Sequence, residues 1–279
     1  MPAFFLFGII YNLKINQVGF SHSRMRVCLL FLISLLSIQN AVACSCGAPN
    51  VTGRYMVEDF IGVVAINSIE ESEYYQEKRV YKAKLDSVQT FKGAFPDSVF
   101  ISGTLEKSYV GQCEISVRPG QKWLLYLQQE KNGHYILSWC DNPLFISGSS
   151  GEPTPLADKA QNQIEKLSYL KNNFPNLHSE FRIYYDLGIY SKFFVNVNNL
   201  QLDMESAYYM LTFNTDVEVY SVEIIKGFGE KVDQRIIQFL KTDSLWHGGN
   251  LSNPEYSIPY ETQYLINMNY SKELKRVGF

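Results

Sequence analysis

Cysteine placement constrains the fold of this chain more than any other feature of its sequence. Cys44 and Cys46 lie two positions apart, and Cys113 and Cys140 follow far downstream. An even number of cysteines in a chain that carries an export signal is the pattern of a disulfide framework. We therefore expect the segment that begins at Cys44 to be covalently joined to distant parts of the chain. The fifth cysteine, Cys28, lies within the signal itself.

The export signal is predicted from the residues before Cys44. Met25-Arg26 is followed by an apolar run, Val27–Ile38, and the small-residue sequence Ala41-Val42-Ala43 ends directly at Cys44. A basic start, a short apolar core and an A-x-A end are typical of a secretory signal peptide, and the run is shorter than a membrane span. A buried hydrophobic helix is the alternative. The sequence thus predicts a signal peptide over residues 25–43.

The two ends of this signal carry further expectations. Residues 1–24 add nothing that the signal needs, so we interpret them as a mis-assigned extension upstream of a start at Met25. At the other end, Cys44 stands where a lipoprotein signal places its acylated cysteine, although Ala41 replaces the usual leucine. A lipidated Cys44 would leave an odd number of cysteines for pairing, so the even count favours simple cleavage, with lipidation as the alternative.

Charge and composition exclude some classes of partner. The whole chain has a formal net charge of −3, and residues 1–43 contain three basic residues (Lys14, Arg24 and Arg26) and no acidic ones. The mature segment therefore has a net charge of about −6, which is poorly suited to nucleic acid or to an anionic membrane surface. The 19 Tyr and 18 Phe favour strands over helices.

The first part of the mature chain, residues 44–149, shows short strands separated by turn signals. Lys92-Gly93 and Asn132-Gly133 are typical turn sequences. Several short strands with turns at close spacing predict a small closed β-barrel. The expected strands are Phe60–Ile66, Arg79–Thr90, Ser98–Ser102, Lys122–Leu127 and His134–Trp139.

A group of motifs in this part supports a family resemblance. They are Cys44-Ser45-Cys46, Phe60–Val64, Phe91-Lys92-Gly93, Cys113, Gly120–Leu127 and Cys140. In these residues the segment resembles the netrin-like domain of the tissue inhibitors of metalloproteinases (TIMP), in its bacterial form. The resemblance implies an OB-fold-like barrel with two bridges, Cys44–Cys113 and Cys46–Cys140.

The same resemblance implies a possible activity at the N-terminus. In the animal inhibitors the free amine and the carbonyl of the first cysteine chelate the zinc of the protease, and the next side chain enters the specificity pocket. Carried over, Cys44 would be the zinc-binding residue and Ser45 the pocket residue. An amine and a carbonyl oxygen suit the open position of a catalytic zinc. The alternative is that both residues only anchor the barrel.

Residues 150–177 are expected to connect two domains. The stretch Ser147–Pro155 is rich in glycine, serine and proline, and it lacks the lysine and spacing of a phosphate-binding loop. Leu156–Asn173 has an apolar face that includes Leu167 and Leu170, so it is predicted to form a helix that packs against one of the domains.

The last part, residues 178–279, is predicted to be a two-layer α+β domain. A strand pair is followed by a helix, a glycine loop and a final strand. In order, these expected elements are Tyr208–Phe213, Val217–Lys226, Lys231–Lys241, the loop Leu245–Gly249 and Tyr256–Met268.

This part resembles the TonB C-terminal domain. The matching residues are Val222–Gly229, Asp233 at the opening of the helix, and Trp246-His247-Gly248-Gly249, where His247 and Gly248 replace the usual Lys and Pro. Members of that family bind a partner peptide by adding its strand to a sheet edge. No transmembrane anchor precedes the domain in the mature chain, so the resemblance implies an interaction module rather than energy transduction.

No pattern in the sequence points to catalysis or to a cofactor. The four histidines are scattered, and metalloprotease, hydrolase and dinucleotide motifs are absent, so we expect neither an enzyme nor an intrinsic metal site. His247 is the histidine to test as a ligand. Glu70–Glu73 is interpreted as a solvated turn, with cation binding as the alternative. The pairs Tyr184-Tyr185 and Tyr208-Tyr209 are expected to pack in the core rather than to stack on carbohydrate.

The sequence therefore predicts an exported, disulfide-stapled binding protein of the bacterial cell envelope. Its location would be periplasmic, outer-membrane-associated or secreted. The expected partner is an envelope or secreted protein, either a peptide added to a sheet edge or a zinc metalloprotease inhibited through Cys44.

Overall fold

The computed structural model describes residues 50–75, 78–103, 105, 114–185, 201–242, 245–250 and 257–278. The predicted mainly β fold with α+β character is confirmed at that level. In the first part the elements are α2 (Val51–Val57), β1 (Phe60–Tyr75), β2 (Lys78–Lys92), β3 (Ser98–Ser102), β4 (Lys122–Leu127), β5 (Ile136–Leu137), η2 (Trp139–Asp141) and β6 (Leu144–Ser147). They are followed by α3 (Ala157–Asn173), β7 (Phe181–Tyr185), β8 (Ser206–Phe213), β9 (Val219–Lys226), α5 (Glu230–Leu240), β10 (Trp246–Asn250), β11 (Thr262–Ser271) and β12 (Arg276–Gly278).

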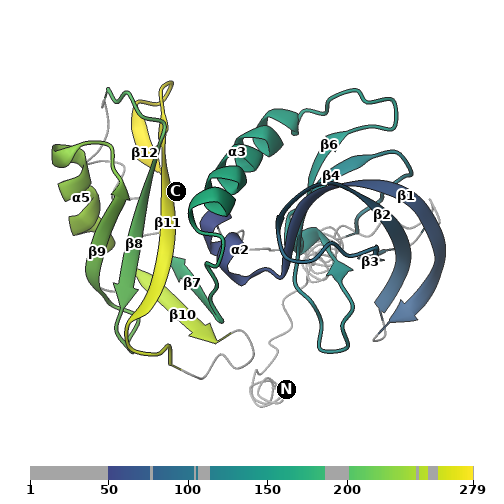
Figure 1. Ribbon diagram of the computed structural model, residues 1–279, viewed down its shortest axis with the longest axis horizontal. Helices are drawn as coiled ribbons and strands as arrows, with labels where there is room; N and C mark the ends of the chain where they lie inside the picture. The colour runs from purple at the N-terminus through teal and green to yellow at the C-terminus, as the bar shows by residue number, and fades with distance from the viewer. Residues whose placement is uncertain are drawn as a thin grey trace, which may run out of the picture. The chain divides into compact units, whose positions relative to one another are not determined.

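The first part of the chain forms a curled six-stranded sheet in the order β5-β3-β2-β1-β4-β6 (Figure 1). β1 and β2 are long antiparallel strands with several register shifts, and such bulges increase the bend and twist of a sheet. β3 runs parallel to β5. The curl surrounds a core that includes Phe60, Tyr81, Ile101 and Leu125, all buried.

The turn after β2 requires a glycine. Gly93 has φ +75°, and a Cβ atom at this position would lie 1.8 Å from the backbone oxygen of Asp59. Because this close approach involves backbone rather than a mobile side chain, no larger residue fits there without a shift of the main chain. The Phe91-Lys92-Gly93 turn of the sequence motif is thereby explained by direct contact with the start of β1.

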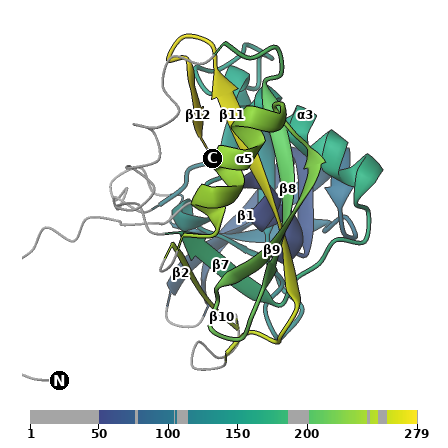
Figure 2. The same ribbon diagram turned by 90° about the vertical axis from the view of Figure 1, so that its left-hand side faces the viewer.

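The last part of the chain forms a four-stranded sheet in the order β12-β11-β8-β9. Neighbouring residues of β8 show that this sheet has a helix on each face. The Tyr208 ring stacks on Tyr169 of α3 at 4.4 Å between centroids, whereas the Tyr209 hydroxyl donates to Asp233 of α5 at 2.5 Å. Successive strand residues point to opposite faces, so α3 and α5 cover opposite sides, as Figures 1 and 2 show.

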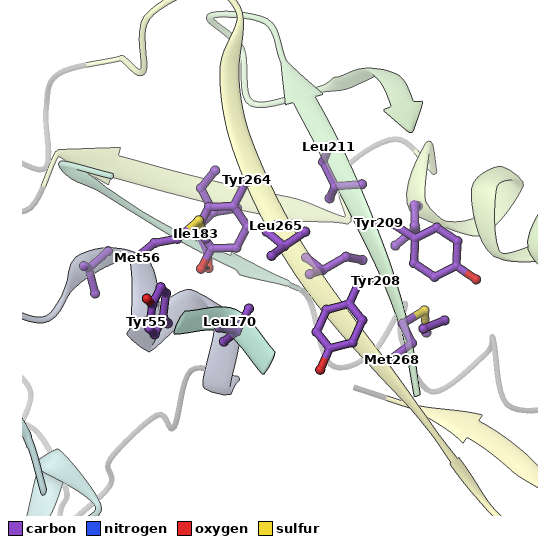
Figure 3. Packing of buried hydrophobic residues seen from close by; sticks show 14 of the residues in the cluster. Tyr55, Met56, Leu170, Ile183, Tyr208, Tyr209, Leu211, Tyr264, Leu265 and Met268 are labelled. Atoms are coloured by element: carbon purple, nitrogen blue, oxygen red, sulfur yellow. Dashed lines mark hydrogen bonds between the residues drawn. The ribbon is translucent and has the colours of Figure 1, made fainter. Parts of the chain in front are cut away.

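One hydrophobic core joins α2 and α3 to the last sheet. Buried Tyr55 and Met56 of α2 and Leu170 of α3 belong to the same cluster as Tyr208 and Leu265 (Figure 3). Cys44–Phe279 accordingly forms one compact unit. The predicted helix Leu156–Asn173 is confirmed as α3. This helix contacts β6 and β2 of the first sheet as well as β8 of the last sheet.

Two sequence predictions about local structure are wrong. The expected loop Leu245–Gly249 contains β10, which pairs with β7; Trp246 anchors it because its indole N–H donates to the Leu240 carbonyl at 2.8 Å. The expected turn at Glu70–Glu73 lies inside β1, where the strand continues because its partner β2 also continues. There Glu70 forms a salt bridge of 2.7 Å with Lys84 of β2.

The final strand is also displaced from its predicted bounds. It was expected over Tyr256–Met268, and β11 instead begins at Thr262, after a turn in which the Pro259 carbonyl accepts from the Thr262 N–H and hydroxyl. A short strand, β12, then pairs back onto the end of β11. Pro259 cannot donate to a ladder and begins this turn, so the strand starts after it.

Candidate functional site

Most of the residues predicted to carry the disulfides and the inhibitory end lie outside the described residues. These are Cys44, Ser45, Cys46 and Cys113. Cys140 is described: it lies in η2 and is disulfide-bonded. Its partner therefore lies in a part of the chain that is not described, and the pairing Cys46–Cys140 stays a prediction.

Arg54 ties α2 to the short helix that carries Cys140. One guanidinium nitrogen donates to the Asp141 carbonyl at 2.5 Å, and the group lies over the Tyr126 ring at 3.6 Å from its centroid. Glu58, one turn further along α2, lies 3.7 Å from the same guanidinium. A buried cation needs such partners, and burial in turn raises the pKa of Tyr126. The result is that α2 is held beside η2.

Two adjoining hollows follow α3 where it faces β11 and β8, and we call them together the α3 cleft. Their volumes are about 520 and 410 Å³, and Asn162, Lys166 and Asn269 line both. Volumes of this size are typical of small-molecule sites. The first hollow is also lined by Asn50, Val51, Arg54, Trp139, Asn142, Pro143, Leu144, Leu156, Lys159, Gln163, Tyr185 and Asn267. The second is also lined by Glu165, Tyr169, Glu205, Ser206, Tyr208, Lys226 and Tyr270.

Lys166 is the central charged group of the α3 cleft. Its ammonium forms no hydrogen bond or salt bridge with any described residue. Burial lowers its pKa to about 8, and the nearby carboxylate of Glu165 opposes this shift only partly. A lysine amine that loses hydration without gaining a partner is destabilising in the folded protein, and this is a frequent property of functional sites.

Two side-chain amides in the first hollow have unused hydrogen-bonding capacity among the described residues. The Gln163 oxygen accepts from the Tyr126 hydroxyl at 2.6 Å, and its amide N–H groups have no described partner. Asn267 is 2% exposed; its nitrogen reaches the Ala207 and Met268 carbonyls at only 3.4 Å, and its oxygen accepts from no described group. Buried polar groups are normally paired, so the Asn267 amide requires an explanation.

The mouth of the first hollow carries an aromatic side chain. Trp139, the residue before the disulfide-bonded Cys140, is 51% exposed. Leu156, the residue before α3, is 42% exposed. In the second hollow, Lys226 lies 5.8 Å from the centroid of the Tyr169 ring, which itself stacks on Tyr208. The α3 cleft thus combines accessible aromatic surface, side-chain amides and an ammonium that has no partner in the described part of the chain.

A separate exposed surface follows β9. Among the described strands, β9 has a single neighbour, β8. Tyr220 and Ile224 on β9 are exposed, and the Tyr220 ring stacks on exposed Tyr260 at 5.6 Å with nearly parallel planes. The Lys241 ammonium donates to the Tyr220 carbonyl at 3.0 Å, and a hollow of about 140 Å³ lies beside this contact. A side chain therefore satisfies a main-chain acceptor on this strand.

The histidines and tyrosines singled out in the sequence are placed as follows. His247 is exposed on β10 opposite Tyr184, and the described part of the chain has no group of three His, Cys, Asp or Glu residues that could hold a metal. Tyr208 and Tyr209 are buried as expected. Tyr184 is 44% exposed, so the prediction of core packing is wrong for this residue, whose strand β7 belongs to a two-stranded sheet.

Sequence reasoning missed the α3 cleft because its residues come from elements that are far apart in the sequence: α2, η2, β6, α3, β7, β8, β9 and β11. One signal was present: Lys166 lies four positions before Leu170, next to the apolar stripe of the predicted helix.

Within the described ranges, no helix has the length and hydropathy needed to cross a membrane. Comparison with protein-family models found no match for this chain, and neither did comparison with curated proteins.

Proposed function

We propose that the mature chain is an exported, non-catalytic protein-binding protein of the bacterial cell envelope, and that a strand of the partner adds to β9. The observation that carries this proposal is the state of the β9 edge. Its Tyr220 carbonyl is bonded by the Lys241 side chain, and two apolar side chains, Tyr220 and Ile224, are exposed along it. An edge of this kind can exchange a side-chain contact for main-chain pairing with a peptide.

The fold supports the two family resemblances behind this proposal. In an OB-fold the first strand lies between the second and the fourth, and the third runs parallel to the last. The arrangement of β1 between β2 and β4, with β3 parallel to β5, is compatible with that pattern. For the TonB-C-like assignment, the support is the β8–β9 hairpin followed by α5 and by β11, which pairs with β8. We infer an OB-fold-like barrel followed by a TonB-C-like domain.

Site-specific photo-crosslinking tests the β9 proposal. A benzophenone side chain at position 224 should capture a defined envelope or secreted protein, whereas the same group at position 231, on α5, should not. The captured protein is then added in purified form, and hydrogen exchange is measured. Slower exchange of amides in β9 supports strand addition, and capture from position 231 alone or unchanged exchange in β9 overturns it.

Metalloprotease inhibition through Cys44 is a second candidate. The supporting observation is that Cys140 is disulfide-bonded in η2, beside the α2 segment that Arg54 holds in place. A bridge from Cys46 to Cys140 would fix the mature N-terminus against the barrel, as the inhibitory mechanism needs. Purified mature protein should then inhibit a zinc protease in a panel, and one extra residue before Cys44 should abolish inhibition. Equal inhibition by both forms of the protein, or no inhibition by either form, would rule out this candidate function.

Both candidates rest on export and processing. We propose cleavage of the 25–43 signal after Ala43, followed by pairing of Cys44 with Cys113 and of Cys46 with Cys140. Intact-mass measurement of the exported protein should give a chain that begins at Cys44 and contains no free thiol. A lipid adduct on Cys44 would instead support the lipoprotein alternative.

A further inference from the structure

The α3 cleft is distinct from the β9 edge and offers a different chemistry. Four side chains that line its first hollow have complementary capacities, and the Trp139 ring among them is exposed. Within the described residues, the Lys166 ammonium has no hydrogen bond or salt bridge and the amides of Gln163 and Asn267 are incompletely bonded. They come from η2, α3 and β11: α3 and β11 share one core with α2, and Arg54 of α2 donates to the Asp141 carbonyl of η2. The hollow is therefore a built site rather than a chance gap between loops.

The polar lining selects the class of ligand. Side-chain amides donate and accept at once, so they pair with groups that do the same, such as sugar hydroxyls. The exposed indole of Trp139 offers a flat apolar face on which the C–H face of a pyranose ring can stack. A purely apolar ligand would leave the amide of Asn267 and the ammonium of Lys166 buried and unsatisfied, which costs free energy.

The charges in the α3 cleft favour a single carboxylate on that ligand. Arg54 already donates to the Asp141 carbonyl, whereas Lys159 and Lys166 have no hydrogen bond or salt bridge with a described residue, and Lys166 is the more buried of these two lysines. Lys159 lies at the exposed start of α3. The second hollow is lined by Lys226, Glu165 and Glu205, and Glu205 is paired with Lys272 outside it at 2.7 Å. A ligand with one negative charge that reaches Lys166 suits this arrangement of charged side chains better than a multiply charged ligand does.

We propose that the α3 cleft binds an acidic saccharide whose carboxylate pairs with Lys166. The sugar hydroxyls bond to Gln163 and Asn267, and one ring packs against Trp139. The interaction is recognition without covalent chemistry, and it does not depend on strand addition at β9. An ion pair with good geometry in a partly dehydrated site contributes more to the binding free energy than one on the open surface. Lys166 is therefore expected to make the largest contribution to the affinity.

Isothermal titration of the mature protein with an aldotriouronic acid, a trisaccharide that carries a single uronic acid residue, tests this proposal, with its methyl ester as a matched neutral ligand. We expect the acid to bind at least 10-fold more tightly than the ester. Lys166→Gln should reduce affinity for the acid at least 10-fold and leave the ester unchanged. Lys231→Gln, which makes the same charge change on exposed α5, should alter neither. Trp139→Ala should weaken both ligands, because ring stacking does not require the carboxylate.

Thermal unfolding of each variant separates loss of binding from loss of folding. Lys166→Gln and Trp139→Ala change partly or largely exposed side chains, so both should unfold within a few degrees of the wild type. The proposal is overturned by any of three results: no binding of the acid at millimolar concentration, equal binding of acid and ester, or full affinity in Lys166→Gln. Preference for a sulfated trisaccharide over the uronate would overturn the carboxylate assignment.

Discussion

Tyr209 and Asp233 form a buried hydrogen bond of 2.5 Å that joins β8 to α5. The same carboxylate accepts from the main-chain N–H groups of Phe228 at 2.8 Å and Gly229 at 3.0 Å, just before the helix begins. A Cβ atom on Gly227 would lie 2.1 Å from the Asp233 carboxylate. Gly227 and Gly229 of the Val222–Gly229 motif and Asp233 are thus parts of one arrangement: a carboxylate inside the first turns of α5 accepts hydrogen bonds from the main chain of the preceding loop.

Replacement of Asp233 should destabilise the protein strongly. Asp233→Ala leaves the buried Phe228 N–H, the Gly229 N–H and the Tyr209 hydroxyl without their acceptor, so we expect a loss of about 2–4 kcal/mol in the free energy of unfolding. Tyr209→Phe removes one of the three bonds and should cost about 1 kcal/mol. Chemical denaturation measures both. Asp216→Ala, at an exposed turn position, is the control and should stay within about 0.5 kcal/mol of wild type; comparable losses at residues 216 and 233 would contradict the role assigned to Asp233.

The local elements could be predicted where side-chain pattern and turn chemistry agree. Ser98–Ser102 and Lys122–Leu127 are bounded by turns and match β3 and β4 in full, and the apolar face of α3 fixes that helix to within one residue. α2 was missed although it carries a start signal, since the Asn50 side chain accepts from the Gly53 N–H at 2.7 Å as a helix cap. A helix of seven residues is too short for its periodicity to stand out.

Features that depend on distant pairing could not be predicted in this way. Trp246-His247-Gly248-Gly249 has the composition of a loop, yet it forms β10 because β7 offers a partner strand and Trp246 is anchored by Leu240. The α3 cleft depends even more on tertiary packing. Lys166 and Asn267, whose hydrogen-bonding capacity is not filled by the described residues, are about a hundred residues apart in sequence, and neither is unusual until α3 is placed on the last sheet.

Gly93 should be intolerant of any side chain, and a second glycine supplies a matched control. Gly93 and Gly151 have similar φ values, +75° and +83°, but a Cβ atom at Gly93 meets the Asp59 backbone whereas at Gly151 nothing lies within 4 Å. Gly151→Ala should therefore cost about 1 kcal/mol from φ strain alone. Gly93→Ala should cost 3 kcal/mol or more, because the backbone must also move. Equal losses of stability for the two variants in urea denaturation would show that the close approach to Asp59 is not important.

Buried tyrosines should make the protein sensitive to alkali. Burial raises the pKa of Tyr81 to about 12 from 10.0 and shifts Tyr126 and Tyr208 in the same direction. Between pH 10 and 12 the unfolded chain loses protons that the folded protein keeps, so stability is full below pH 10 and falls as the pH rises. Unfolding free energies at pH 8, 10 and 11.5 should decline after the second point, with phenolate absorbance rising as the protein unfolds. Constant stability through pH 11.5 would be the contrary outcome.

Lys166 should lower stability at neutral pH, and its removal should reveal this. Its pKa in the folded protein is about 8, because burial penalises the ammonium, against 10.5 in the unfolded chain. The unfolded chain therefore binds more protons between pH 8 and 10.5, and the penalty is full below pH 8 and disappears above 10.5. Lys166→Met should be more stable than wild type by about 1–3 kcal/mol at pH 7.

The pH dependence of this gain distinguishes it from a simple packing effect. Wild type and Lys166→Met share the same tyrosines, so their difference in unfolding free energy isolates the lysine, and it should shrink toward zero as the pH approaches 10.5. Lys231→Met, at an exposed position of α5, should change the free energy of unfolding by no more than about 0.5 kcal/mol at any pH. A gain that stays constant from pH 7 to 10 would mean that the added methionine packs better than lysine. A gain that fades shows instead that the ammonium is destabilising in the free α3 cleft, where an anionic ligand would stabilise it.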